Sequence, residues 1–149
     1  MLRASAIVLA LLLPTTAFAE ERTVTIKGGQ VSTEVGLTVQ VKSIKLGEDA
    51  TTVRLLASFD SQATNFINMN DEQNAYLAWG DAPEQRLHMR MIGENKWMRV
   101  ANGQTMEGDL VFPGAVPDDT EKLTLVFNPG QDGDDTNAPG VTVPLDIKP

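Results

Sequence analysis

The chain has 149 residues, with 20 acidic residues against 12 basic ones and a net charge of −8 at pH 7. A negative protein repels the phosphates of nucleic acids and of anionic lipids, so neither is an expected partner. Cysteine is absent, which excludes a disulfide framework and a thiol nucleophile.

Residues 1–19 have the layout of a secretory signal peptide. Arg3 precedes the apolar run Ala6–Leu13, and the small residues Ala17 and Ala19 stand at the end of the segment. The run is far shorter than the roughly 20 residues that span a bilayer. We therefore expect cleavage after Ala19, no membrane insertion, and a single mature domain of residues 20–149. Export without cysteine favours a bacterial periplasmic or secreted protein.

Alternation of apolar and polar residues with a period of two dominates the rest of the chain and predicts half-buried strands. In Leu37–Leu46 the alternation changes parity, which predicts a β-bulge near Lys42 and Ser43. Pro144 lacks a backbone N–H and indicates an edge strand at the C-terminus. The expected strands are Thr23–Gly28, Leu37–Leu46, Thr51–Asp60, Tyr76–Trp79, Arg86–Ile92, Lys96–Val100, Thr105–Phe112, Glu121–Pro129 and Val141–Pro149.

No long amphipathic helix is expected between these strands, and turn-forming residues separate them every ten residues or so. This spacing predicts an all-β fold, an immunoglobulin-like β-sandwich of seven to nine antiparallel strands. An up-and-down barrel is the alternative.

Several catalytic chemistries lack their residues in this sequence. His88 is the one histidine, so a histidine-rich zinc site is excluded and a serine triad would depend on that single imidazole. Nucleophile-elbow, P-loop and dinucleotide-binding motifs are absent. We predict no enzyme activity, no cofactor and no resident metal. A hydrolase that uses two distant carboxylates is a less favoured alternative.

Methionine and histidine in "HMRM", His88–Met91, are ligands that copper carriers use. On a strand, however, Met89 and Met91 face one side and His88 the other, so the ligands diverge. We therefore interpret the methionines as core residues, a use that suits their flexible side chains.

The outward face of the same predicted strand carries Arg86, His88 and Arg90, and Trp97 follows shortly after. These four residues form the candidate binding site, since they make the one basic, aromatic-bearing stretch of an acidic chain. The alternative is that Thr105, Glu107 and Asp109 on a neighbouring strand simply neutralise the arginines.

The stretch "GQDGDDTNAPG", Gly130–Gly140, gathers Asp132, Asp134 and Asp135. Starting the calcium-loop register at Asp132 puts Asn137 where glycine is required and Val143 where glutamate is required, so the EF-hand motif fails. We interpret the stretch as a solvated loop, with a weak calcium site as the alternative.

The stretch "NGQTMEGDLVFPGAVPDDTEKLTLVFNP" resembles a bacterial extracellular immunoglobulin-like domain family of exported immunoprotective antigens and lipoproteins, whose label mentions a telomeric repeat-binding factor. The resemblance covers roughly residues 39–128. It implies an immunoglobulin-like sandwich in the cell envelope and adds no active site. The family's lipid-anchoring cysteine is missing here. The matching residues are Gly103, Gly108, Leu110, Phe112, Leu123 and Leu125.

These patterns together favour an exported, non-enzymatic immunoglobulin-like module that binds a protein or an envelope component through a sheet face or end loops. A periplasmic carrier of a metal ion or small ligand is the alternative.

Overall fold

The computed structural model describes residues 21–90 and 93–148. Within these residues the secondary structure is eleven β-strands and one short 3₁₀ turn, η1 (Pro83–Gln85). The strands are β1 (Arg22–Gly28), β2 (Gln30–Ser32), β3 (Leu37–Leu46), β4 (Ala50–Phe59), β5 (Phe66–Asn68), β6 (Tyr76–Ala78), β7 (Arg86–His88), β8 (Arg99–Ala101), β9 (Thr105–Pro113), β10 (Lys122–Phe127) and β11 (Val141–Lys148).

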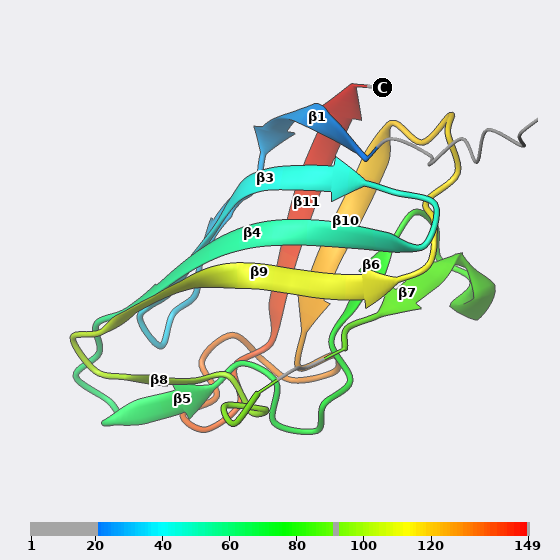
Figure 1. Cartoon of the computed structure of the whole chain (residues 1–149). Coiled ribbons are helices and arrows are strands. Elements are labelled where there is room, and N and C mark those ends of the chain that lie inside the picture. The colour runs from blue at the N-terminus through cyan, green and yellow to red at the C-terminus, as the bar shows by residue number, and fades with distance from the viewer. Residues whose placement is uncertain (1–20, 91–92, 149) are drawn as a thin grey trace, which may run out of the picture.

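Nine strands form one antiparallel sheet in the order β7-β6-β10-β11-β1-β3-β4-β9, with β2 paired to β3 beside this path. The strand β1 joins two halves, because Arg22–Val24 pairs with β3 and Thr25–Gly28 pairs with β11. In Figure 1 the strands β3, β4 and β9 cross in front of β10 and β11 at a steep angle. A backbone bridge between Arg90 and Val111 brings the two ends of the sheet together.

The predicted all-β antiparallel class is confirmed. The main sheet has nine strands, and β5 and β8 add a separate two-stranded ribbon. The bent, nearly closed sheet is compatible with the predicted sandwich, although its two halves are continuous through β1. Residues 1–20, which include the predicted signal peptide, lie outside the described residues. Among the residues described, no helix has the length and apolar character needed to cross a membrane.

The core lies between the two halves of the sheet and is built from the inward-facing residues of each strand. Along β11 burial alternates strictly from Val141 to Lys148, as the period of two requires. Phe59, Phe112 and Phe127 are the largest side chains in this core. Met69 and Met98 are buried, and Met89 and Met106 pack against the core. The methionines described here are therefore core residues, as predicted.

The parity change in β3 is a β-bulge, since its register with β4 shifts between Val41 and Ser43. The bulge prediction is confirmed, and Lys42 is exposed at this point.

The predicted edge position of β11 is wrong, because β11 pairs with β10 on one side and β1 on the other. The Pro144 carbonyl accepts a hydrogen bond from the Gly29 N–H at 3.2 Å, so the position where Pro144 lacks an N–H also faces β1. The pairing of β1 with β11 ends there, at Gly28 and Leu145, and little pairing is therefore lost.

Candidate functional site

The four residues of the candidate binding site separate onto two surfaces. Arg86 and His88 lie at the two ends of β7, at the edge of the main sheet. Arg90 is exposed beyond this strand, and its backbone N–H bonds to Val111 at 2.8 Å. Trp97 is 42% exposed and lies next to the β5–β8 ribbon. The structure thus defines two candidate sites rather than one basic face.

Tyr76 on β6 organises the first site. It is the direct cross-strand partner of His88, and Ala78 is the partner of Arg86. The guanidinium carbon of Arg86 lies 4.4 Å from the Tyr76 ring centroid, a cation–π geometry. The His88 ring meets Tyr76 edge-on, with centroids 6.3 Å apart. Tyr76 could not be identified as a site residue from the sequence, because its position opposite His88 and beneath Arg86 depends on the register between β6 and β7.

The alternative prediction, that Glu107 and Asp109 on β9 neutralise this basic strand, is wrong. Glu107 and Asp109 instead form ion pairs with Arg54 on β4, at 3.4 and 3.3 Å. The hydrogen bond that Arg54 donates to Asp109 is the main cause that raises the pKa of Arg54. The register explains the choice, since Arg54 faces Asp109 directly across the β4–β9 ladder. Among the described residues, Arg86 has no ion pair, and its buried Nε atom has no hydrogen-bond partner.

Arg86 and Tyr76 border a hollow of about 410 Å³ on the outer face of β6, β10 and β11, which we call the β10 groove. Its floor is low because small side chains occupy the middle of this face. Ala78 is paired with Thr124, and Val126 lies between Tyr76 and Thr142 in the ladder. The larger Tyr76 and Arg86 form one wall.

Two turns close the ends of the β10 groove, and each contains a glycine. At one end a Cβ atom on Gly80 would collide with the side chain of Gln85, whose Oε1 accepts from the Ala82 N–H at 3.2 Å. At the other end a Cβ atom on Gly140 would collide with the backbone of Gln131. The backbone contact at Gly140 therefore requires glycine, whereas the Gln85 side chain beside Gly80 is flexible.

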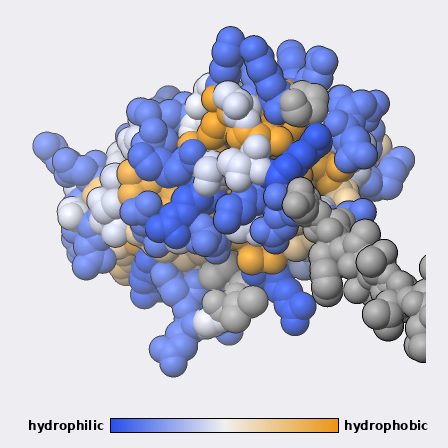
Figure 2. Space-filling model, turned by 45° about the horizontal axis from the view of Figure 1, so that its top comes forward, coloured by the Kyte–Doolittle hydropathy of each residue, from blue (hydrophilic) through white to orange (hydrophobic). Residues whose placement is uncertain are grey.

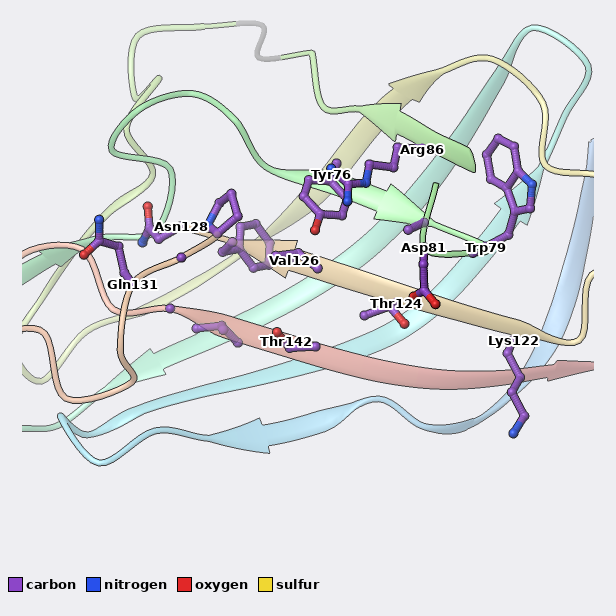
Figure 3. Close-up of a pocket in the computed structure, with 17 residues that line it drawn as sticks. Tyr76, Trp79, Asp81, Arg86, Lys122, Thr124, Val126, Asn128, Gln131 and Thr142 are labelled. Carbon is purple, nitrogen blue, oxygen red and sulfur yellow. The ribbon is translucent and has the colours of Figure 1, made fainter. Parts of the chain in front are cut away.

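The lining of the β10 groove is mainly polar. Its charged residues are Asp81, Arg86 and Lys122, and threonine hydroxyls come from Thr124 and Thr142. Figure 3 shows Arg86 lying along Tyr76, with Asp81 extending over β10 beside Thr124. Lys122 stands at the same end as Asp81, and Gln131 stands at the opposite end. This lining offers hydrogen bonds and charge rather than an apolar cavity.

The β5–β8 ribbon carries the second site. Phe66 and Trp97 are the two large hydrophobic residues described as exposed, at 37% and 42%. Arg99 lies 4.0 Å from the Phe66 ring centroid, and the ammonium of Lys96 lies 4.5 Å from the Trp97 ring centroid. We call these four residues the ribbon patch. Figure 1 shows the ribbon below the main sheet, at the lower end of the molecule.

Asparagines fasten the ribbon to the rest of the domain. The Arg99 Nε donates to the Asn68 Oδ1 at 3.0 Å. Asn70, which is 1% exposed, donates its side-chain N–H to the Lys96 carbonyl at 2.9 Å. Asn128 donates to the carbonyls of Asn68 and Pro139, each at 2.9 Å. Buried amides with these partners hold the backbone below the ribbon patch in one arrangement.

The acidic loop is organised by its own backbone. The Asp135 carboxylate accepts N–H groups from Ala138 at 2.7 Å and Asn137 at 2.9 Å. These two hydrogen bonds, that of Ala138 first, lower the pKa of Asp135. In the part of the chain that the structure describes, no three or more His, Cys, Asp or Glu side chains form a group that could hold a metal ion.

Polar side chains cover most of the face shown in Figure 2, and apolar ones form small patches between them. On that face there is no broad apolar surface that would compete with the two sites described above.

Comparison with protein families, with curated proteins and with solved structures found no match in any of the three. The resemblance to the extracellular immunoglobulin-like family therefore stays a prediction, and the two sites rest on their own geometry.

Proposed function

We propose that this protein is an exported, non-enzymatic binding module of the bacterial cell envelope, periplasmic or secreted, with an immunoglobulin-like fold. Its partner is another protein or an envelope component. The predicted signal peptide and the antiparallel all-β class support this proposal.

The ribbon patch is the observation that carries the proposal. Exposed aromatic rings retain an unfavourable contact with water that a partner would remove, and tryptophan and arginine are enriched in the energetic centres of interfaces. Here Phe66 lies on the ribbon and Trp97 lies next to it, and each ring is accompanied by a cation. Because the protein as a whole is negative, this local positive charge fits an acidic region of the partner.

Rigidity also favours binding through the ribbon patch. The hydrogen bonds of Asn68, Asn70 and Arg99 hold both strands of the ribbon before any partner arrives. A surface that is already ordered loses less conformational entropy when it binds.

Photo-cross-linking from the ribbon in an envelope extract tests the proposal. A photoreactive residue at position 94, which is exposed and precedes Lys96 and Trp97 closely in the chain, should give one reproducible cross-linked species. Trp97→Ala and Phe66→Ala should each reduce that species at least about tenfold. Lys42→Ala, on the exposed bulge of β3, is the matched control and should leave it unchanged. Equal yields from all variants, or no reproducible species, would contradict the proposal.

A periplasmic carrier of a metal ion or a small ligand is the second candidate. The β10 groove favours its small-ligand form, because its volume lies within the usual range for ligand sites, roughly 300–1,000 Å³. Co-purification of a stoichiometric metabolite, together with no cross-linked partner, would favour the carrier over the binding module.

A further inference from the structure

We propose that the β10 groove binds a small ligand through a single carboxylate group, with Arg86 as its anchor. This inference deepens the second candidate function, the small-ligand carrier, and does not rest on the ribbon patch. The groove and the ribbon patch are separate surfaces with no residue in common, so either proposal can fail without the other.

The state of Arg86 is the first argument. Its guanidinium is held over the Tyr76 ring, and its buried Nε has no hydrogen-bond partner among the described residues. Arg54, by contrast, has both Glu107 and Asp109 within 3.4 Å. A guanidinium is a rigid fork of N–H donors that matches the two oxygens of a carboxylate. The terminal N–H groups of Arg86 therefore have no carboxylate partner among the described residues, although Arg86 lines the β10 groove.

The charge of the groove sets the charge of the ligand. The charged lining residues are two cations, Arg86 and Lys122, and one anion, Asp81, so their sum is one positive charge. A ligand with one negative charge balances this sum, whereas a doubly charged phosphate leaves one negative charge uncompensated beside Asp81 in a partly desolvated hollow. The β10 groove thus favours a carboxylate over a phosphate monoester.

The floor of the groove defines the rest of the ligand. Thr124 and Thr142 offer hydroxyls that donate and accept, and Gln131 offers an amide at one end. Asp81 accepts hydrogen bonds only. A ligand with hydroxyl or amide groups near its carboxylate satisfies this set. Two sources share that chemistry, a free peptide C-terminus and a sugar acid.

Titration of isotope-labelled protein, followed by the backbone amide signals of Gly80, Thr124 and Thr142, tests the inference. The two probes are N-acetyl-alanyl-alanine and glucuronate, and they separate the peptide source from the sugar source. The neutral controls are N-acetyl-alanyl-alanine amide and glucose, and inorganic phosphate is the charge control. We expect saturating shifts from at least one carboxylate by about 10 mM, tenfold above a millimolar dissociation constant, and much weaker shifts from all three controls.

Variants connect the shifts to the proposed anchor. Arg86→Gln should weaken carboxylate binding by about tenfold or more, since a hydrogen bond to a charged group is lost. Arg90→Gln, an exposed arginine outside the groove, should bind like the wild type. Asp81→Asn keeps the fold contacts of Arg86 and should strengthen phosphate binding several-fold by removing the repulsion.

Three results would overturn the inference. The first is that neither carboxylate shifts the groove amides by about 10 mM. The second is that the neutral controls or phosphate bind wild-type protein as well as the carboxylates do. The third is that Arg86→Gln, with an unchanged amide spectrum in the absence of probe, binds as tightly as wild type. If Arg86→Gln disturbs the fold, the inference is tested with Asp81→Asn instead. The inference is then contradicted if Asp81→Asn prefers the carboxylate probes over phosphate by the same factor as wild type does.

Discussion

The side-chain nitrogen of Asn128 donates a hydrogen bond of 2.9 Å to the carbonyl oxygen of Asn68, across 60 residues of chain. Asn128 lines one end of the β10 groove, and Asn68 lies in the ribbon. The same amide donates to Pro139 and accepts the Asp71 N–H at 3.1 Å. One buried side chain therefore fastens the β10–β11 connection to β5 and the turn after it, and so links both candidate sites.

Replacing Asn128 should destabilise the whole lower end of the domain. Asn128→Ala removes the side-chain hydrogen bonds to two buried carbonyls and to the partly buried Asp71 N–H, and it puts alanine at a φ of 46°. We therefore expect a loss of about 3 kcal/mol or more in the free energy of unfolding. Asn128→Gly should lose less, because glycine accepts a positive φ. Urea denaturation measures both, with exposed Asn65→Ala as the control. A loss below about 1 kcal/mol for Asn128→Ala would show that the network is unimportant.

The two arginines of the candidate site should respond differently to mutation. The sequence indicated that Arg86 and Arg90 are equally exposed, but Arg86 is only partly exposed and covers Tyr76. Arg86→Ser should cost about 1 kcal/mol through the lost cation–π contact, and Arg90→Ser should stay within about 0.5 kcal/mol. Thermal and urea unfolding of the two variants provide the comparison. Equal effects would mean that the Tyr76 contact adds nothing to stability.

The long strands could be predicted because a period of two is clear over eight to ten residues. The strands β3, β4, β9 and β11 were all expected, and even the bulge at Val41–Ser43 left a parity change in the sequence. The three-residue strands β2 and β5 were not expected. Three residues hold too little alternation to differ from a loop, so partner strands rather than local sequence define them.

The candidate site was predictable only in part, for a related reason. Alternation correctly put Arg86 and His88 on the solvent side of β7 and Leu87 in the core. It could not identify Tyr76 or the β10 groove, because those depend on which strands pair and in what register. Pro144 shows the same limit, since a missing N–H excludes only one ladder position and not an interior strand.

Acid should remove a contribution of Asp135 to stability. Its pKa is lowered in the folded state from 3.8, so the ionised form is favoured by folding and the contribution is fully present above the unfolded pKa. It is lost as the pH falls through the folded pKa. The stability difference between wild type and Asp135→Asn should therefore be largest above about pH 5 and should shrink toward pH 2. Urea unfolding across this range measures it.

Asp134→Asn is the matched control for that comparison. Asp134 is adjacent and exposed, and its side chain makes no hydrogen bond in the described part of the loop. Its stability difference from wild type should change little with pH. A wild-type advantage over Asp135→Asn that grows toward low pH would contradict the proposed hydrogen bonds.

Export should remove residues 1–19 and leave Glu20 as the first residue. Arg3 is the one charged residue in that segment, so the mature chain carries a net charge of −9. Expression of the full chain in a bacterial host, followed by intact-mass measurement of the exported protein, checks the cleavage point. Ala19→Arg should block processing, because the cleavage site requires a small residue. Exported protein that retains Met1 would contradict the signal-peptide prediction.

Calcium should not stabilise this protein, although its acidic loop contains three aspartates. Asp135 already accepts two backbone N–H groups, and the loop lacks the glycine and glutamate positions of an EF-hand. Thermal unfolding curves with a chelator and with millimolar calcium should therefore superimpose. Calcium at a concentration a hundredfold above its dissociation constant would add about 2.7 kcal/mol to the free energy of unfolding, which is easily measured. Asp132→Ala is the diagnostic variant, because it removes a carboxylate and keeps the backbone of the loop. The backbone carbonyl of Asp132, which accepts the N–H groups of Asp135 and Gly140, is still present in alanine. An increase in melting temperature with calcium that Asp132→Ala abolishes would establish a calcium site.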